Sequence, residues 1–374
     1  MSLSQTSLRS TALLHNTLEI LLKLSPAIAL AIGMTVFLLM YLPSMAKQVG
    51  LVASPDLRKR HQDQIPLIGG IAIVIAVFFS MSLLPFGLSR FRIFVLCLGL
   101  LLIVGVLDDH QDLPASARFL MHLLISSILV IGDEVVVRSI GDIFGWFDGN
   151  EQGLGLVAVP LTIVGITGVI NAFNMIDGHD GVGVSVFLLS GTSLIGLSFM
   201  HGDYVVGYLL MLFCCSASVF LVFNLSKSTG LLKKSFLGDA GSTCLGLTIV
   251  YVLIVFSQKE STPILRTVTA PWIIGLPLID MFAVIIKRFG SGRSPVRADR
   301  SHIHHILIDR GLKSHTVLLL LVGIQGVFCA IALVANTLLP ISDWILFWGM
   351  FILLGIFLSV SFYLRVEHSD ADIS

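Results

Sequence analysis

Long apolar runs separated by short polar segments follow one another along nearly the whole chain. A helix that spans a membrane needs about 20 mostly apolar residues. Eleven stretches fit this requirement: 26–45, 67–86, 91–107, 117–132, 155–174, 183–200, 204–223, 240–257, 268–286, 316–337 and 342–364. Pro160, Pro271 and Pro277 interrupt some of them, and such breaks are tolerated where helices pack around a cavity. The pattern predicts an all-α, polytopic membrane helical bundle with about eleven transmembrane helices.

The composition agrees with this interpretation. Hydrophobic residues make up 55% of the chain and charged residues only 12%, whereas a soluble protein carries about 25% charged residues. Without an internal repeat or a low-complexity linker, we expect one domain over 26–364, an N-terminal segment 1–25 and a tail 365–374. Lys+Arg and Asp+Glu number 23 each, so the net charge does not predict a nucleic-acid partner.

The basic residues predict the orientation of the bundle. Eleven spans place the termini on opposite sides, and the odd-numbered loops then share the side of the C-terminus. That side holds sixteen of the 23 Lys and Arg residues. Because cytoplasmic loops are enriched in Lys and Arg, we expect it to be cytoplasmic.

Five polar clusters fall on the same side. They are 56–61 with Pro66, Gly69 and Gly70; Asp108-Asp109; Asn171 to Gly181; 233–242, which contains Phe236-Leu-Gly-Asp-Ala-Gly-Ser242; and 293–305. Each cluster alone has a structural explanation. However, all five lie on the side that the Lys and Arg count independently predicts to be cytoplasmic, and this predicts one cytoplasmic active site. The longest loop of the opposite side, about 133–154, has no assigned role.

The third cluster is the richest in candidate ligands. Asn171, Asn174, Asp177 and Asp180 recur every three residues, and each such step turns a helical side chain back by only about 60°. We therefore expect the first three to share one helix face. Amides and carboxylates at the mouth of a membrane segment are costly unless a cation binds there. The alternative is a polar helix end with a glycine stop and an aspartate cap.

Two further clusters carry carboxylates. Asp108 and Asp109 directly follow an apolar run, and adjacent carboxylates stay ionised together only near a metal or a basic group. A solvated helix end is the alternative. Asp239 lies between Gly238 and Gly241, where it either caps a helix or binds a metal. Oxygen ligands suit Mg²⁺ or Mn²⁺.

The last cluster, Asp299-Arg-Ser-His-Ile-His-His305, is basic. A zinc site would need a Cys or carboxylate nearby to complete a tetrahedral set. Arg300, His302, His304 and His305 instead suit recognition of a phosphate and a sugar. The alternative is a basic cytoplasmic loop, which is also the favoured interpretation of Arg58-Lys-Arg-His61.

Carboxylates and amides for one divalent cation, surrounded by basic groups near the bilayer surface, suit a reaction between a soluble phosphorylated donor and a lipid acceptor. Phosphoryl transfer depends mainly on charge neutralisation and positioning. A transporter is the rival interpretation, but it should place polar groups near the bilayer midplane and often has repeated halves.

The polar blocks resemble the polyprenyl-phosphate N-acetylhexosamine-1-phosphate transferases. The matching blocks, in family order, are Arg58 to Gly70, Gly105-Val-Leu-Asp-Asp109, Asn171 to Gly181, Phe236 to Ser242, and Pro277-Leu-Ile-Asp280 through His302-Ile-His-His305. The last of these is similar to the WecA branch rather than to the muropeptide-precursor branch. The resemblance implies transfer of N-acetylglucosamine-1-phosphate from UDP-N-acetylglucosamine to undecaprenyl phosphate, the first lipid-linked step of O-antigen-type polysaccharide synthesis.

The resemblance also implies roles for individual residues. Asn174 and Asp239 would bind Mg²⁺, with Mn²⁺ as a substitute. Asp177 and Asp180 would shape the nucleotide pocket, and Asp108 and Asp109 would lie by the acceptor phosphate. The substrate-binding residues would be Asn171, Arg300, His302, His304 and His305, joined by Arg118, which stands nearest to the position of the family's lysine.

The expected partners are UDP-N-acetylglucosamine, undecaprenyl phosphate and the lipid bilayer, with a homodimer as the alternative to a monomer. We expect a multi-pass protein of the bacterial cytoplasmic (inner) membrane with its active site facing the cytoplasm. A sister transferase that uses another UDP-N-acetylhexosamine or UDP-muramyl-pentapeptide is the alternative function. His179 departs from the family pattern and has no assigned role.

Overall fold

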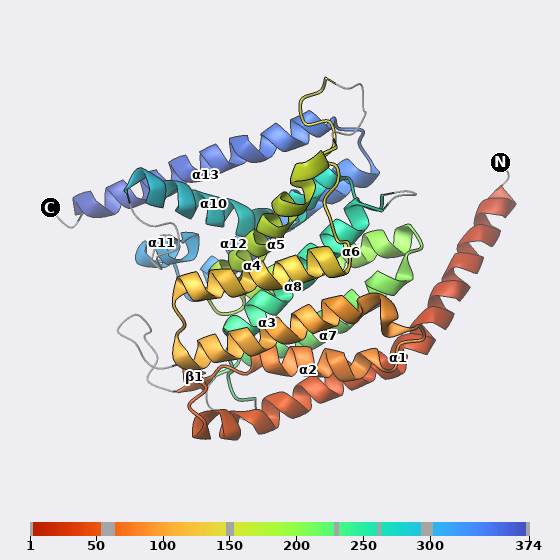
Figure 1. Cartoon of the computed structure of the whole chain (residues 1–374), viewed down its shortest axis with the longest axis horizontal. Coiled ribbons are helices and arrows are strands. Elements are labelled where there is room, and N and C mark those ends of the chain that lie inside the picture. The colour runs from red at the N-terminus through yellow and green to blue at the C-terminus, as the bar shows by residue number, and fades with distance from the viewer. Residues whose placement is uncertain are drawn as a thin grey trace.

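The computed structural model describes residues 3–53, 64–146, 153–227, 232–259, 263–292 and 302–371. Helices dominate this part of the chain (Figure 1). The α-helices are α1 (Leu3–Gln48), α2 (Gly69–Met81), α3 (Arg92–Gln111), α4 (Ala115–Gly132), α5 (Ala158–Ile176), α6 (Val182–Met200), α7 (Tyr204–Asn224), α8 (Gly238–Ser257), α9 (Ala270–Ile273), α10 (Gly275–Gly290), α11 (Ile303–Asp309), α12 (Ser314–Thr337) and α13 (Asp343–Ala371). The 3-10 helices are η1 (Leu88–Phe91), η2 (Gly155–Val157) and η3 (Thr267–Thr269). In the same part of the chain, the named strands are β1 (Val52–Ala53) and β2 (Ile65–Pro66), which pair antiparallel with Val52 opposite Pro66.

The predicted all-α membrane bundle is confirmed, but the count of eleven spans is not. Nine helices among the described residues are long and apolar enough to cross a membrane. The count is ten if α9 and α10, which meet at an angle of 83°, form one broken span. The range predicted as 67–86 contains only the 13-residue α2, because the chain turns at 82–86 instead of continuing the helix. The division into 1–25, 26–364 and 365–374 stays a prediction.

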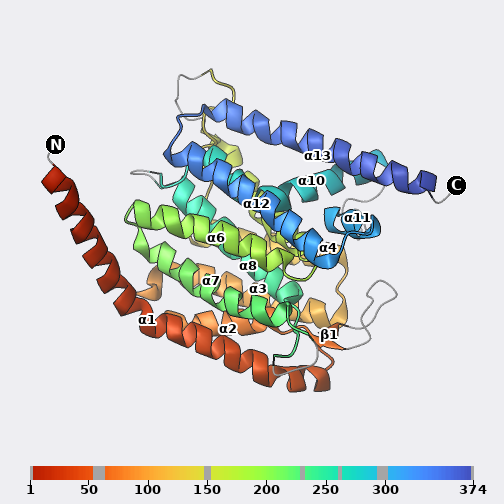
Figure 2. The ribbon, with the colours of Figure 1, turned by 180° about the vertical axis from the view of Figure 1, so that it is seen from behind.

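Helix α8 runs through the centre of the bundle. Of its most apolar 18-residue window, 94% is buried inside the protein, and it packs against α2, α3, α5 and α6. Figure 2 shows α6, α7 and α12 on the side of α8 opposite to that seen in Figure 1. Two glycines permit the closest contacts, since a Cβ on Gly70 would lie 2.2 Å from the nitrogen of Gly241, and one on Gly105 would lie 2.3 Å from the Cα of Ala240.

The segment that leads into α8 is attached to the start of α2. The backbone N–H of Phe236 donates to the carbonyl of Pro66 at 2.9 Å, and the N–H groups of Gly69 and Gly70 donate to the carbonyls of Phe236 and Leu237, each at 2.9 Å. Two motifs that are far apart in sequence therefore pack together and hold the N-terminus of α8 in place.

Several helix ends gather around this N-terminus. The end of α3, the start of α4, the end of α5 and the start of α6 lie at the end of the molecule that also carries β1 and α11 (Figure 1). The polar clusters predicted to share one side occupy these ends and α11. Arg58-Lys-Arg-His61 lies outside the described residues.

Candidate active site

Arg118 joins two of the predicted carboxylates. Its Nη1 donates to Oδ2 of Asp108 at 2.8 Å and to Oδ2 of Asp239 at 3.2 Å. The other oxygen of Asp108 accepts a hydrogen bond from the N–H of Leu113 at 2.9 Å. The end of α3, the first turn of α4 and the first turn of α8 are thus connected through one guanidinium.

Asp109 has a different environment from its neighbour. Its oxygens accept hydrogen bonds from the N–H of Asp239 at 2.8 Å and of Ala240 at 3.2 Å. Asp109 therefore caps the N-terminus of α8, where backbone N–H groups lack partners within the helix. The sequence left open whether Asp239 caps α8, and the structure assigns that task to Asp109. The carboxylate of Asp239 instead faces Arg118 and α5.

Asn174 and Asp239, the predicted metal ligands, are in direct contact. Nδ2 of Asn174 donates to Oδ1 of Asp239 at 2.8 Å and to the hydroxyl of Ser242 at 3.1 Å. Among the described residues, no three His, Cys, Asp or Glu side chains surround a common point that could hold a metal. Mg²⁺, however, is usually bound by only one or two carboxylates together with waters and substrate phosphates. The all-oxygen pair fits that cation.

Asp177 follows the last residue of α5, next to the same carboxylates. Burial raises the pKa of Asp177 well above its usual value, and the negative charges of Asp239, Asp180 and Asp109 raise it further. A hydrogen bond from the backbone of Gly183 acts in the opposite direction. Such crowding of carboxylates is costly and is relieved by a bound cation.

Asp180 forms an ion pair with Lys234. The ammonium of Lys234 also lies 5.4 Å from the ring centre of Phe236. His179, for which the sequence suggested no role, hydrogen-bonds Ser314 at the start of α12 at 2.9 Å. The turn from 177 to 181 is therefore attached to both the segment before α8 and α12.

The three histidines of α11 and its N-cap form a stack beside this turn. The rings of His302 and His304 are nearly parallel, with centres 5.7 Å apart, and the centre of His305 lies 4.2 Å from that of His304. A Cβ on Gly178 would lie 2.4 Å from Nε2 of His304. Burial, followed by the charges of the neighbouring imidazoles, lowers the pKa of His304 to about 2. His304 is therefore neutral at physiological pH, and its two ring nitrogens have no hydrogen-bond partner among the described residues.

One of the predicted substrate-binding residues, Asn171, does not join this cluster. Nδ2 of Asn171 donates to the carbonyl of Thr167 within α5 at 2.7 Å, and its side chain also hydrogen-bonds His122 of α4. Asn171 thus contributes to the contact between α4 and α5 instead of sharing the carboxylate network of Asn174. Arg300 lies outside the described residues.

The sequence interpretation missed two residues of the site. Lys234 was counted only as a determinant of orientation, although it precedes Asp239 by five residues in the same cluster. Asp280 belonged to a matching block without a role, and it contacts His302. In both cases the sequence did not indicate the partner. Asp180 lies 54 residues from Lys234 along the chain, and His302 lies 22 residues from Asp280.

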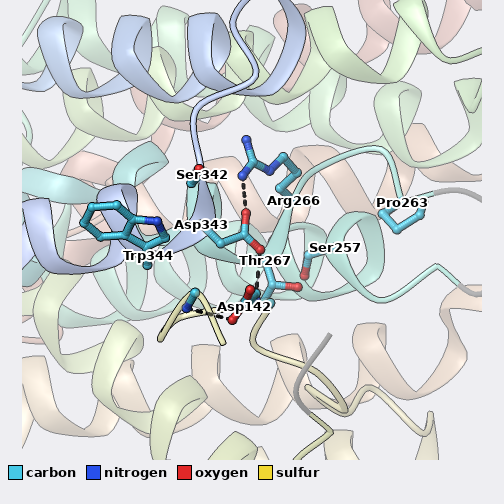
Figure 3. Close-up of a pocket in the computed structure, with 10 residues that line it drawn as sticks. Asp142, Ser257, Pro263, Arg266, Thr267, Ser342, Asp343 and Trp344 are labelled. Atoms are coloured by element: carbon cyan, nitrogen blue, oxygen red, sulfur yellow. Dashed lines mark hydrogen bonds and ion pairs between the residues drawn. The ribbon is translucent and has the colours of Figure 1, made fainter. Parts of the chain in front are cut away.

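A cavity of about 490 Å³ lies at the opposite end of α8 (Figure 3). Asp142, Ser257, Arg266 and Asp343 are among its lining residues. The 20 residues of α8 separate it from Asp239 by roughly 30 Å at 1.5 Å per residue. Because of this separation, the cavity is distinct from the carboxylate cluster. It contains its own ion pair, between Arg266 and Asp343.

Comparison with known proteins identifies the relatives of this chain. Residues 91–257 match the family model described as Glycosyl transferase family 4. Three similar proteins are each named undecaprenyl-phosphate alpha-N-acetylglucosaminyl 1-phosphate transferase. The protein from Yersinia pestis is 34% identical over 309 residues, which cover 81% of each chain. That from Escherichia coli (strain K12) is 32% identical over 83% of this chain and 84% of its own, and that from Haemophilus influenzae is 34% identical over 83% and 86%.

These matches extend over the clusters that converge in the structure, and they favour the expected transferase over a transporter. The residues that carried the resemblance, from Gly105 to Ser242, lie within or directly beside the contacts described above. The chain belongs to the undecaprenyl-phosphate alpha-N-acetylglucosaminyl 1-phosphate transferase family, within glycosyl transferase family 4.

Proposed function

We propose that this protein transfers N-acetylglucosamine-1-phosphate from UDP-N-acetylglucosamine to undecaprenyl phosphate, which gives undecaprenyl-diphosphate-N-acetylglucosamine and UMP. The observation that carries the proposal is the convergence of Asp108 and Asp239 on Arg118 at one end of a membrane bundle, with Asn174 and Asp177 beside Asp239. The relatives described above are named for the same transferred group and the same acceptor. An acceptor phosphate held in the bilayer and a soluble donor can meet only where the site lies at helix ends.

The cation site is part of the proposal. Asp239 and Asn174 would hold Mg²⁺, or Mn²⁺ in its place, and the ion would neutralise the charge of the donor diphosphate. The carboxylate of Asp239 and the amide oxygen of Asn174 support this assignment, because both are oxygen ligands and further carboxylates crowd the same place.

Arg118 and Asp108 would position the acceptor. A phosphate oxygen of undecaprenyl phosphate attacks the phosphorus that carries the sugar, a new P–O bond forms, and the bond from that phosphorus to the bridging oxygen of UMP breaks. The acceptor is a phosphomonoester with a second pKa near 6, so it is mostly dianionic at pH 7 and needs no general base. Both oxygens of Asp108 already accept hydrogen bonds, which supports a positioning role.

The remaining residues would bind the donor. Asp177 and Asp180 would line the nucleotide pocket, with Lys234 holding Asp180 in place. His302, His304 and His305 would contact the sugar and diphosphate, since His304 lies against Gly178 of the same turn and the rings of the other two lie beside that of His304. Arg300 is proposed to join them, and Arg300→Lys should lose most transfer because lysine cannot reproduce bidentate phosphate binding.

The proposal includes a location. The chain is a multi-pass membrane protein with bacterial relatives. We propose the cytoplasmic (inner) membrane, with the active site in the cytoplasm, on the basis of the Lys and Arg distribution. The product would begin a lipid-linked O-antigen-type polysaccharide. A homodimer stays a prediction.

A donor screen tests the function. The purified protein is incubated with undecaprenyl phosphate, Mg²⁺ and one radiolabelled sugar nucleotide at a time: UDP-N-acetylglucosamine, UDP-N-acetylgalactosamine or UDP-muramyl-pentapeptide. We expect lipid-linked label and UMP only with the first, and no label with Asp239→Asn. Asp203→Asn serves as the matched control, because Asp203 pairs with Lys259 at the opposite end of the bundle. A preference for another donor would assign the protein to a sister activity.

A further inference from the structure

Asp280 is a buried carboxylate whose two oxygens both accept hydrogen bonds from one short segment. The side chain belongs to a residue that is only 1% exposed. Its Oδ2 lies 2.7 Å from Nδ1 of His302, and its Oδ1 accepts a hydrogen bond from the N–H of Ile303 at 3.0 Å. A buried carboxylate is costly unless it is fully paired, and these two bonds together attach α10 to the start of α11.

The bend between α9 and α10 places Asp280 there. The helix axis turns by 83° at Ile274, and Pro277 lies in the first turn after it. Asp280 follows one turn later, on the buried face of α10 together with Ile279 and Ala283. The carboxylate therefore reaches α11 from an element that is 22 residues earlier in the chain.

The contact with Asp280 determines which atom His302 presents. An ionised carboxylate can only accept hydrogen bonds, so Nδ1 of His302 carries a proton and Nε2 is left for other partners. His302 is the N-cap residue of α11, with an extended backbone, so the bond to Asp280 fixes its ring outside the helix.

The ring of His302, held in place by Asp280, in turn packs against the ring of His304. His302 stacks on His304, with an angle of 8° between the two rings. His304 has no hydrogen-bond partner among the described residues, and it lies so close to Gly178 that a Cβ there would contact it at 2.4 Å. Packing against the ring of His302 therefore helps to hold His304 against the turn that carries Asp177 and Asp180.

We propose that Asp280 is a positioning residue that acts through His302: it keeps the proton on Nδ1 and directs Nε2 to the sugar-diphosphate of the donor. This inference rests on the proposed function of the histidine cluster. Carboxylates that orient a functional imidazole in this way contribute roughly 10- to 100-fold to activity or affinity in related arrangements.

A double-mutant cycle between Asp280 and His302 tests the proposal. An amide has a single acceptor oxygen, so Asp280→Asn cannot accept from both Nδ1 of His302 and the N–H of Ile303. We expect kcat/KM for the UDP-sugar to fall about 10- to 100-fold. In the His302→Ala background, Asp280→Asn should change kcat/KM less than about twofold, because contacting residues that act together are not additive. The pH profile of kcat/KM should change with Asp280→Asn in the wild-type background only.

Asp203→Asn is the matched control, since it neutralises a carboxylate paired with Lys259 at the opposite end of the bundle, and it should leave kcat/KM and its pH profile unchanged. Multiplicative effects of Asp280→Asn and His302→Ala, or a silent Asp280→Asn, would overturn the inference.

A second pair of variants applies if Asp280→Asn does not fold. The amide of Gln lies near the position of Nε2, and that of Asn near Nδ1. His302→Gln should therefore retain more activity than His302→Asn, and the reverse order would contradict the proposal. These outcomes differ from a failure of the proposed function, in which the wild type itself would not use UDP-N-acetylglucosamine. The cycle is then measured with the donor that the wild type does use.

Discussion

The two ends of the bundle each contain an arginine paired with an aspartate, yet the two arrangements differ in kind. At the proposed active site, Arg118 is shared by Asp108 and Asp239. At the opposite end, Arg266 pairs with Asp343 (Figure 3). Arg266 also donates to the carbonyls of Ala335 at 3.1 Å and Ile341 at 2.7 Å. An arginine–aspartate pair alone does not distinguish a functional site from a structural one.

The surroundings make the distinction. At the opposite end, Asp343 accepts from the N–H of Asp142 at 3.0 Å, and Asp142 accepts from those of Gly145 and Trp146. These groups attach the loop that follows α4 to the start of α13. At the proposed active site, burial raises the pKa of Asp177, and the negative charges of Asp239, Asp180 and Asp109 raise it further. The crowding of negatively charged carboxylates around Asp177 is consistent with a site that binds a cation or a substrate.

Removal of divalent cations should affect only one end and should have the largest effect. We expect EDTA to reduce transfer at least about 10³-fold, because a catalytic metal stabilises transition-state charge by several kcal/mol, and Mg²⁺ or Mn²⁺ should restore it. The measurement is transfer of label to undecaprenyl phosphate. Full activity in EDTA, or rescue by zinc alone, would contradict the proposed cation site.

Matched substitutions should separate the two arginine clusters. Asp108→Asn should lower kcat about 10²- to 10³-fold, as does the loss of one preorganised electrostatic group, with little change in UDP-sugar binding by calorimetry. Asp343→Asn should leave kcat unchanged and lower stability by about 1–3 kcal/mol through loss of a partly buried charged hydrogen bond, measured by thermal unfolding in detergent. The comparison fails if Asp343→Asn lowers kcat as much as Asp108→Asn.

Two glycines with positive φ give a smaller test. Gly238 (φ +75°) is the first residue of α8, and a Cβ there would lie 2.5 Å from Oδ2 of Asp109. Gly145 (φ +70°) would place a Cβ 2.9 Å from Trp344. Each change to Ala should cost about 1–2 kcal/mol of stability from the backbone conformation. Only Gly238→Ala should also lower kcat, because it displaces Asp109 and with it the first turn of α8. Equal kcat values for the two variants would argue against this role of the cap.

The smallest expected effect concerns the stability cost of crowded carboxylates at the proposed active site. Because the pKa of Asp177 is raised on folding, its ionisation costs stability as the pH rises from the unfolded value near 3.8 through the folded one. Asp177→Asn should therefore raise the melting temperature in EDTA at neutral pH, and the gain should shrink toward pH 4 and when Mg²⁺ is added. A lower melting temperature under all these conditions would show that Asp177 is held by favourable contacts instead.

The sequence predicted the helices and the convergence of the polar clusters because both depend on local patterns. Apolar runs specify helices, and polar residues at their ends must gather where water or ligand is present. It could not predict that Asp108 and Asp109, adjacent in sequence, contact different elements, because Asp109 caps α8 only when α3 packs against it. The pairing of Lys234 with Asp180 and of Asp280 with His302 depends in the same way on tertiary packing. The short α2 and the bend before α10 were hidden because hydropathy does not distinguish a continuous helix from a broken one.

The burial of α8 also has a consequence for the synthesis of the protein. Helices α2, α3, α5 and α6, which pack against α8, all precede it in the chain and therefore leave the ribosome first. Helix α8 has a mean hydropathy of 1.9, which suits contact with lipid, yet its final neighbours are protein. It enters the membrane when most of its surroundings have been made, and only then does Asp239 meet Asp109 and Asn174. The chain therefore completes the proposed cation site late, when most of its length has been translated.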